Sequence, residues 1–229
     1  MNHPRQPRLP AIILAVAAVG LIPAVAAAQN GNWITTTGGT YNWGDPANWS
    51  GGAVADGTDG TARFWVGLTG GVTVNLETPR TINKLVFDSG STLGWTIAGT
   101  NPLTLSPTSA NTGLEIQVGY VTDVYSPTVT IAAPLVANQG FAKSGTGTLV
   151  LTGDNTITGP IYVQSGVLAV SRTATSNPLG NGWISMWGGT LRLGIGYAGE
   201  AAQTFANNVV VPADPTIDVR SPAGGTLGD

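Results

Sequence analysis

Cysteine is absent from the chain, and histidine occurs once, at His3, in a segment that we expect to be removed. Catalytic Ser-His-Asp triads, Cys-His nucleophiles and zinc sites that contain histidine are therefore excluded. A bound metal ion would need oxygen ligands alone. The lack of cysteine also means that no disulfide stabilises the fold, although the export route argued below is one where disulfides are common.

Charged residues are scarce as well, at 9% of the chain, with 9 Lys and Arg against 12 Asp and Glu. Binding to nucleic acid phosphates or to an anionic membrane surface requires clustered Lys and Arg, so neither partner is expected. Disordered chains are usually rich in charge and poor in apolar residues, whereas 42% of these 229 residues are hydrophobic. The composition therefore indicates a folded protein of low charge.

Residues 1–28 have the features of a cleaved secretory signal peptide. A start containing Arg5 and Arg8 precedes an apolar run at 11–22, and small alanines occupy 26–28. The apolar run of 12 residues is shorter than the ~20 that a membrane-spanning helix needs. We expect cleavage after Ala28 and a secreted or cell-surface product without a transmembrane segment.

The remaining chain divides by composition into two parts. Residues 29–71 form a Trp-rich N-terminal cap in which Trp33, Trp43 and Trp49, separated by turn-forming glycines, are expected to build a small core. Residues 72–229 contain short runs in which apolar and polar residues alternate, a pattern typical of strands. Examples are the runs at 72–74, 85–87 and 114–118.

A five-residue pattern recurs in the second part: Gly or Pro, usually Thr, then an apolar, a variable and an apolar residue. Its copies begin at residues 127, 147, 166, 189 and 215. Such a period is typical of a solenoid, in which each copy forms one coil and buries its apolar face against the next. Strands one coil apart then pair in parallel. The sequence thus predicts an all-β fold in which 72–229 form a parallel β-helix.

The alternation within each copy assigns its side chains to two faces. The residues expected to stack inward are Val129, Ile131, Leu149, Leu151, Leu168, Val170, Leu191, Leu193, Ile217 and Val219. The expected outward column is Thr130, Val150, Ala169, Arg192 and Asp218, in which Arg192 and Asp218 should form an ion pair across adjacent coils. An antiparallel β-sandwich is the competing architecture, but few Asn-Gly or Asp-Gly hairpin turns separate these runs.

The segment 143–159 reads KSGTGTLVLTGDNTITG, and the stretch 141–170 around it resembles the autotransporter-associated β-strand repeat. The resemblance implies a right-handed parallel β-helix of the passenger type on an exported protein, and it brings no catalytic residues. The sequence departs from the family pattern at Ile157 and at Ile161 and Tyr162, where strand-compatible residues are kept. Because proteins of this family are usually longer, we expect the chain to be part of a longer passenger.

Trp183 and Trp187 are the candidate ligand-binding residues. If Ile184 and Met186 face the core, the two tryptophan rings project from one outer face about 13 Å apart, where they can stack on sugars or on a partner protein. The alternative is that a neighbouring loop or coil covers both rings.

Two further patterns are weaker. The glycines at 194–199 fit a dinucleotide-binding fingerprint, but the pattern after them is strand-like instead of helical, which favours a loop between coils. Asp56 and Asp59 lack the third acid of a calcium loop, which favours a polar turn. We therefore expect no metal site and no cofactor.

The remaining acids are the candidates for a β-helix lyase or glycosidase, which needs two carboxylates close together. They are Glu115, Asp123, Asp154, Glu200, Asp214 and Asp218. Because they occupy different phases of the repeat, convergence is not expected. The leading hypothesis is an exported, non-catalytic β-helical surface or adhesion segment, with surface glycans or other surface proteins as partners. The alternative is a carbohydrate-active β-helix enzyme or a glycan-binding module.

Overall fold

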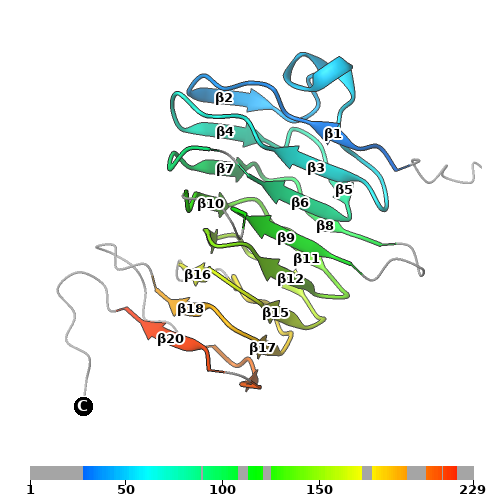
Figure 1. Cartoon of the computed structure of the whole chain (residues 1–229). Helices are drawn as coiled ribbons and strands as arrows, with labels where there is room; N and C mark the ends of the chain where they lie inside the picture. Colours follow the sequence, from blue (N-terminus) through cyan, green and yellow to red (C-terminus); the bar gives the residue numbers. More distant parts are fainter. Residues whose placement is uncertain are drawn as a thin grey trace, which may run out of the picture.

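The computed structural model describes residues 28–88, 90–107, 113–120, 125–171, 177–194, 205–212 and 214–220. Within these ranges the strands form three sheets that share one coiled path, and Figure 1 shows the coils stacked one on another from the N-terminal to the C-terminal end. The signal peptide expected at 1–28 lies outside the described residues except for Ala28.

The first of the three sheets, called sheet I here, carries one strand from each coil. Its order is β1 (Gly31–Asn32), β3 (Thr61–Phe64), β6 (Lys84–Phe87), β9 (Glu115–Val118), β12 (Phe141–Ser144), β15 (Ile161–Val163), β17 (Ile184–Met186) and β19 (Val209–Val210).

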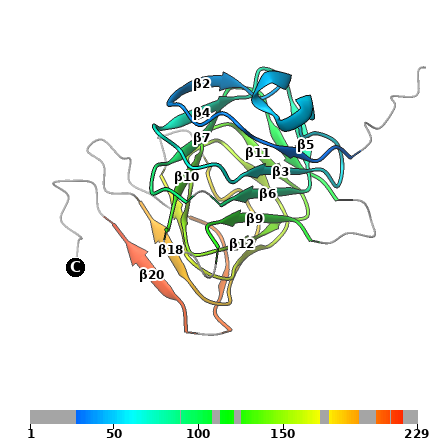
Figure 2. The same ribbon diagram turned by 45° about the horizontal axis from the view of Figure 1, so that its top comes forward.

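Sheets II and III complete the coils. Sheet II has the order β2 (Gly39–Asn42), β4 (Val72–Asn75), β7 (Trp95–Ala98), β10 (Thr128–Ile131), β13 (Thr148–Leu151), β16 (Val167–Val170), β18 (Thr190–Leu193) and β20 (Thr216–Val219). Sheet III contains β5 (Arg80–Ile82), β8 (Leu103–Leu105), β11 (Leu135–Ala137) and β14 (Thr156–Ile157). In Figure 2 the three sheets surround a common interior.

All pairings between these strands are parallel, as the recurring pattern predicts, so the antiparallel sandwich is wrong. The register aligns equivalent positions of successive coils: Leu149 of β13 lies beside Val129 of β10 and Leu168 of β16. Equivalent apolar side chains therefore stack in columns, and those of the inner coils are covered by the coil above and the coil below.

The prediction of an inward column is confirmed for its first seven residues, all of which are buried. They are Val129, Ile131, Leu149, Leu151, Leu168, Val170 and Leu191. The next residue, Leu193, packs against the core. The prediction is wrong for Ile217 and Val219, which are 49% and 55% exposed. Among the described residues, β20 pairs only with β18, so its apolar side chains lack a covering coil on one side. In the predicted outward column Val150 and Ala169 are buried.

An aromatic cluster fills the N-terminal end of the interior. Trp33 and Trp49 lie edge to face with ring centroids 5.2 Å apart, and Phe64 stacks on Phe87 at 4.7 Å. The indole of Trp43 donates a hydrogen bond of 2.8 Å to a backbone carbonyl, that of Ala55. The predicted aromatic core is thus present, although β1, β2 and β3 belong to the same sheets as later strands, and the boundary at 71/72 stays a prediction.

Two 3-10 helices, η1 (Pro46–Asn48) and η2 (Ser50–Gly52), lie at this end of the solenoid (Figure 1). The Asp45 side chain caps η1 by accepting a hydrogen bond from the amide of Ala47, and Pro46 occupies a first-turn position where its missing N–H costs nothing. Trp49, which separates the two helices, forms an antiparallel bridge with Trp33.

Candidate binding surface

The outer face of sheet I between β9 and β17 carries the candidate binding residues. On β9 and β12, Gln117 and Ser144 lie side by side in register and face outward. Gln164 follows the paired residue Val163 and continues the row by one coil, since its amide donates to the carbonyl of Lys143 at 2.9 Å. Trp187 continues it by another, because its amide donates to the Val163 carbonyl at 2.9 Å.

We call this row of four side chains the amide row: Gln117, Ser144, Gln164 and Trp187. Its members repeat at the spacing of adjacent strands, ~4.8 Å, along the solenoid axis. Two of them carry amides, one carries a hydroxyl and the last carries a ring, so the row offers hydrogen-bond donors and acceptors without a formal charge.

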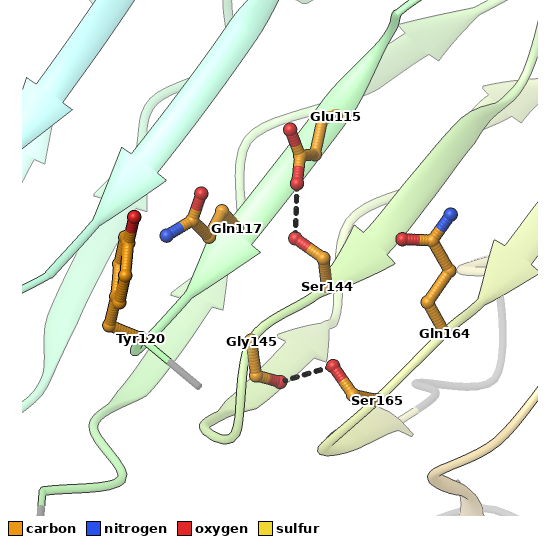
Figure 3. Close-up of a pocket in the computed structure, with 7 residues that line it drawn as sticks. All are labelled: Glu115, Gln117, Tyr120, Ser144, Gly145, Gln164 and Ser165. Atoms are coloured by element: carbon orange, nitrogen blue, oxygen red, sulfur yellow. Dashed lines mark hydrogen bonds between the residues drawn. The ribbon is translucent and has the colours of Figure 1, made fainter. Parts of the chain in front are cut away.

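A pocket of about 310 Å³ opens on the amide row (Figure 3). Its lining residues are Glu115, Gln117, Tyr120, Ser144, Gly145, Gln164 and Ser165. The exposed ring of Tyr120 stands at one side in Figure 3, and the Gln164 side chain stands at the other. Glu115 is the one acidic side chain in this lining.

The Glu115 carboxylate is already engaged on both of its oxygens. Lys84 of the neighbouring strand forms an ion pair with Oε2, and the Ser144 hydroxyl donates a hydrogen bond to Oε1. A glycosidase needs a second carboxylate within several Å, one to protonate and one to attack or activate water. The pocket lining supplies a single carboxylate, whose charge Lys84 balances, so it presents a polar, charge-compensated wall.

Trp183 directly precedes β17 and Trp187 directly follows it, and their side chains are 40% and 60% exposed. Ile184 and Met186 between them are buried, as the alternation predicts. The Trp183 ring packs edge to face on Tyr162 of β15, with centroids 5.7 Å apart. Their roles as ligand-binding residues remain a proposal, taken up below.

Two of the other predicted acids lie on or beside other sheets. Asp218 lies on sheet II, where Arg192 donates a hydrogen bond of 2.8 Å from Nε to its Oδ2 in the predicted register. The hydrogen bonds from Arg192 and then Arg220 lower the pKa of the Asp218 carboxyl. Asp154, which precedes the sheet III strand β14, accepts a hydrogen bond of 2.9 Å from the amide of Asn177. Asp123 and Glu200 lie outside the described residues, as do 195–199 of the glycine pattern.

A second group of charges occurs near the N-terminal end, where Arg80 lies between two acids. Its guanidinium contacts the Asp56 carboxylate at 3.1 Å and also pairs with Glu77. Asp56 further accepts hydrogen bonds from the amides of Gly57 and Thr81, at 2.9 and 3.1 Å. These contacts hold Asp56 in a polar turn and leave its carboxylate no free oxygen. Among the described residues, no group of three or more acidic side chains is placed to hold a metal ion.

Lys143 lies beneath the amide row with its side chain in the core. Its Nζ donates hydrogen bonds to three carbonyls, those of Ser144, Gly145 and Ser165, at 2.9, 3.0 and 3.0 Å. Burial lowers the pKa of Lys143 to about 7. The sequence reasoning assigned no role to this lysine, and the signal available was a charged residue at an apolar position of an alternating run.

The amide row was also missed, because the recurring pattern traced on the sequence follows sheet II. Gln117, Ser144 and Gln164 share one feature in the sequence: each lies one or two residues before a glycine, at 119, 145 and 166. Those glycines have positive φ angles and turn the chain from sheet I toward sheet II. Aligning these glycines pairs Gln117 and Gln164 with Lys143 instead of Ser144, so the corners alone do not define the row, which depends on the strand register.

The fold and this surface define a parallel β-solenoid with an exposed polar and aromatic face. Residues 141–170 match the family model described as a passenger-associated-transport-repeat, so the resemblance predicted for this stretch is confirmed. Among curated proteins, the chain is similar to the adhesin BmaC autotransporter of Brucella suis biovar 1 (strain 1330), with 33% identity over 122 residues. The alignment covers 52% of this chain and 3% of that adhesin. No solved structure is significantly similar to the chain.

No helix within the described ranges has the length and apolar character that crossing a bilayer would require. The aligned portion of this chain corresponds to a small part of a much longer adhesin. An activity of such a whole protein is therefore only proposed for this chain.

Proposed function

We propose that the chain is an exported, non-catalytic adhesion segment, part of an autotransporter-like passenger that reaches the cell surface or the medium. The observation that carries the proposal is the passenger repeat at 141–170 inside a continuous parallel β-solenoid. The similarity to an autotransporter adhesin and the signal-like residues 1–28 support it.

A solenoid suits this role because its coils are held by neighbours alone and present side chains in regular columns along a rigid axis. Trp183 and Trp187 are the proposed contact residues on that surface. Large exposed rings lose little conformational entropy when they bind, so they are frequent energetic centres of recognition surfaces. The engaged state of Glu115 supports a role in binding without turnover.

Adhesion is tested directly by coating beads with the full chain and counting their attachment to cultured host cells and to extracellular matrix. We expect attachment above that of beads coated with an unrelated protein of similar charge. The double variant W183A/W187A should attach less, whereas W65A, which removes an exposed tryptophan next to β3, serves as the matched control. Absence of attachment by the native chain, or turnover of a polysaccharide panel, would overturn the proposal.

Export is tested separately by expressing the full chain in a Gram-negative host and sequencing the N-terminus of the recovered protein. We expect a mature chain that begins at Gln29. A product that retains residues 1–28 in the cytoplasm would contradict the export step and leave the binding surface unaffected.

A further inference from the structure

We infer that the amide row and its pocket bind a neutral oligosaccharide, laid along the solenoid axis across β9, β12, β15 and β17. This inference rests on the proposed adhesive function and names its ligand class. The observation behind it is a set of amides beside exposed rings, in a pocket lining whose one described carboxylate is paired with Lys84.

The polar groups of the row remain available to a ligand. Figure 3 shows hydrogen bonds from Ser144 to Glu115 and from Ser165 to the Gly145 carbonyl, and the side-chain amides of Gln117 and Gln164 take part in neither. A primary amide offers two donors and a two-lone-pair acceptor, which match the paired hydroxyls of a sugar ring. The Ser144 hydroxyl, having donated to Glu115, retains its lone pairs as acceptors.

The charge of the surface argues for a neutral ligand. The carboxylate of Glu115 is compensated by Lys84 and by a hydrogen bond from Ser144, so the pocket attracts neither anions nor cations strongly. An acidic glycan such as a sialylated or sulfated chain would meet no Lys or Arg among the lining residues. Displacing Lys84 to bind a cation would cost the ion pair.

The rings supply the apolar half of sugar recognition. Tyr120 and Trp187 are exposed at opposite ends of the surface, just after β9 and β17, with the amides between them. The C–H face of a pyranose is apolar and packs on an aromatic face, while its hydroxyls point to the sides, where the amides lie. Apolar rings combined with neutral hydrogen-bonding groups are the composition that this ligand class requires.

The dimensions fit short oligosaccharides. The pocket of about 310 Å³ is at the lower end of the range for small-molecule sites, about 300–1,000 Å³, and suits one or two sugar units. The rung spacing of ~4.8 Å is comparable with the length of a pyranose unit in an extended chain. Consecutive sugars can therefore meet consecutive side chains, with the last ring reaching Trp187 one coil beyond Gln164.

The experiment uses the full chain and saturation-transfer NMR followed by titration with gluco-, manno- and galacto-oligosaccharides, and with sialylated and sulfated oligosaccharides as the charged set. We expect binding to a member of the neutral set, with little change between about 50 and about 500 mM NaCl, because no charge is recognised. Preference for the charged set, strong weakening by salt or no binding to any neutral oligosaccharide would overturn the inference.

Three variants locate the site. W187A should weaken binding about tenfold or more, and Q164A, which removes one hydrogen-bonding group, about three- to tenfold. W65A is the matched control and should bind as the native chain does. Far-UV circular dichroism verifies the fold of each variant, and Q164A keeps the test decisive if W187A is unstable. Equal loss in W65A and W187A, or native binding by both W187A and Q164A, would place the ligand elsewhere.

The two proposals fail in different ways. Beads that attach to cells while no neutral oligosaccharide binds would refute the glycan inference and leave adhesion standing, with a protein partner as its explanation. Oligosaccharide binding that follows the variants, combined with beads that do not attach, would retain the site and refute adhesion.

Discussion

Lys143 places a titratable amine in the core of this fold. An ammonium ion in the core loses its hydration, and three carbonyls at the corners of two adjacent coils replace the lost water. Those carbonyls belong to Ser144, Gly145 and Ser165, at corners where the backbone turns and its carbonyls are not paired within a strand ladder. Lys143 therefore links the coil of β12 to that of β15 from the inside.

Lys143 should make the stability of the chain depend on pH in the alkaline range. Its pKa is about 7 in the folded protein and 10.5 in an unfolded chain, so between these values the unfolded state binds more protons. The free energy of unfolding should therefore rise with pH, by up to about 3 kcal/mol from about pH 7 to about pH 9.5. Urea titrations at both pH values measure it.

The variant K143M is the control for this titration, since other lysines and tyrosines also titrate in the alkaline range. The difference between native and K143M unfolding free energies should change with pH, and it should be constant below about pH 6. A difference that is independent of pH throughout the alkaline range would show that the ammonium keeps an ordinary pKa in the core.

The carboxylate of Asp218 is hydrogen-bonded by two arginines. Arg192 donates to its carboxylate across adjacent coils and Arg220 donates from the same strand end, at 2.8 and 3.0 Å. Replacing Arg192 by Gln should raise the pKa of Asp218 toward its usual value, because the leading cause of the shift is removed. Carboxyl-detected NMR titration measures this. R220Q should produce the smaller change, and the reverse order would contradict the assignment.

At the scale of the element, the corners between strands decide where each coil turns. Gly145 has a φ of 77° and its missing side chain leaves room for the coil before it. A Cβ at this position would lie 2.2 Å from the carbonyl oxygen of Gly119. Two demands therefore meet at one residue: a left-handed backbone and a close approach of two main chains.

Gly145→Ala should thus destabilise the protein by more than the backbone strain alone, about 3 kcal/mol or more in the free energy of unfolding. The matched control is Gly51→Ala in η2, where φ is 63° and a Cβ would have no other atom within 4 Å, so only strain of about 1–2 kcal/mol applies. Urea denaturation compares the two. Equal losses would mean that the coils can separate at this corner without cost.

Across the whole molecule, stability should follow the position of a coil in the stack. Each coil contacts its immediate neighbours, so inner coils are covered on both sides and terminal ones on one side. The apolar side chains of β13 are buried, whereas those of β19 and β20 are exposed. Burial thus falls toward the C-terminal end of the described coils even though the strand pairing is the same, whereas the tryptophans at the N-terminal end are buried.

Hydrogen exchange should reveal this gradient. The backbone amides of β13 should exchange about 100-fold or more slowly than those of β20, although both strands are hydrogen-bonded in parallel pairs. Mass spectrometry of exchange at the peptides containing 148–151 and 216–219 measures the difference. Similar protection of the two strands would show that another part of the chain or a second molecule covers β20.

Much of the architecture could be predicted from the sequence because its causes are local and repeated. The alternation around Val129, Leu149, Leu168 and Leu191 sets which face is apolar, and the recurrence of the pattern sets which strands become neighbours. The ion pair of Arg192 follows from the same register. The predicted burial of Ile217 is wrong because burial also requires a covering coil, which a pattern within one strand does not specify.

The winding of this chain follows from its recurring sequence pattern, since a parallel coil is the arrangement that buries every copy of a recurring apolar face. The side-chain contacts on the outside and the inside of sheet I, by contrast, follow from the folded path of the coils. Gln117, Ser144 and Gln164 align because coils of unequal length turn at particular glycines, and Lys143 enters the core because three corner carbonyls converge there. These contacts depend on the length and path of whole coils, which a pattern within one strand does not specify.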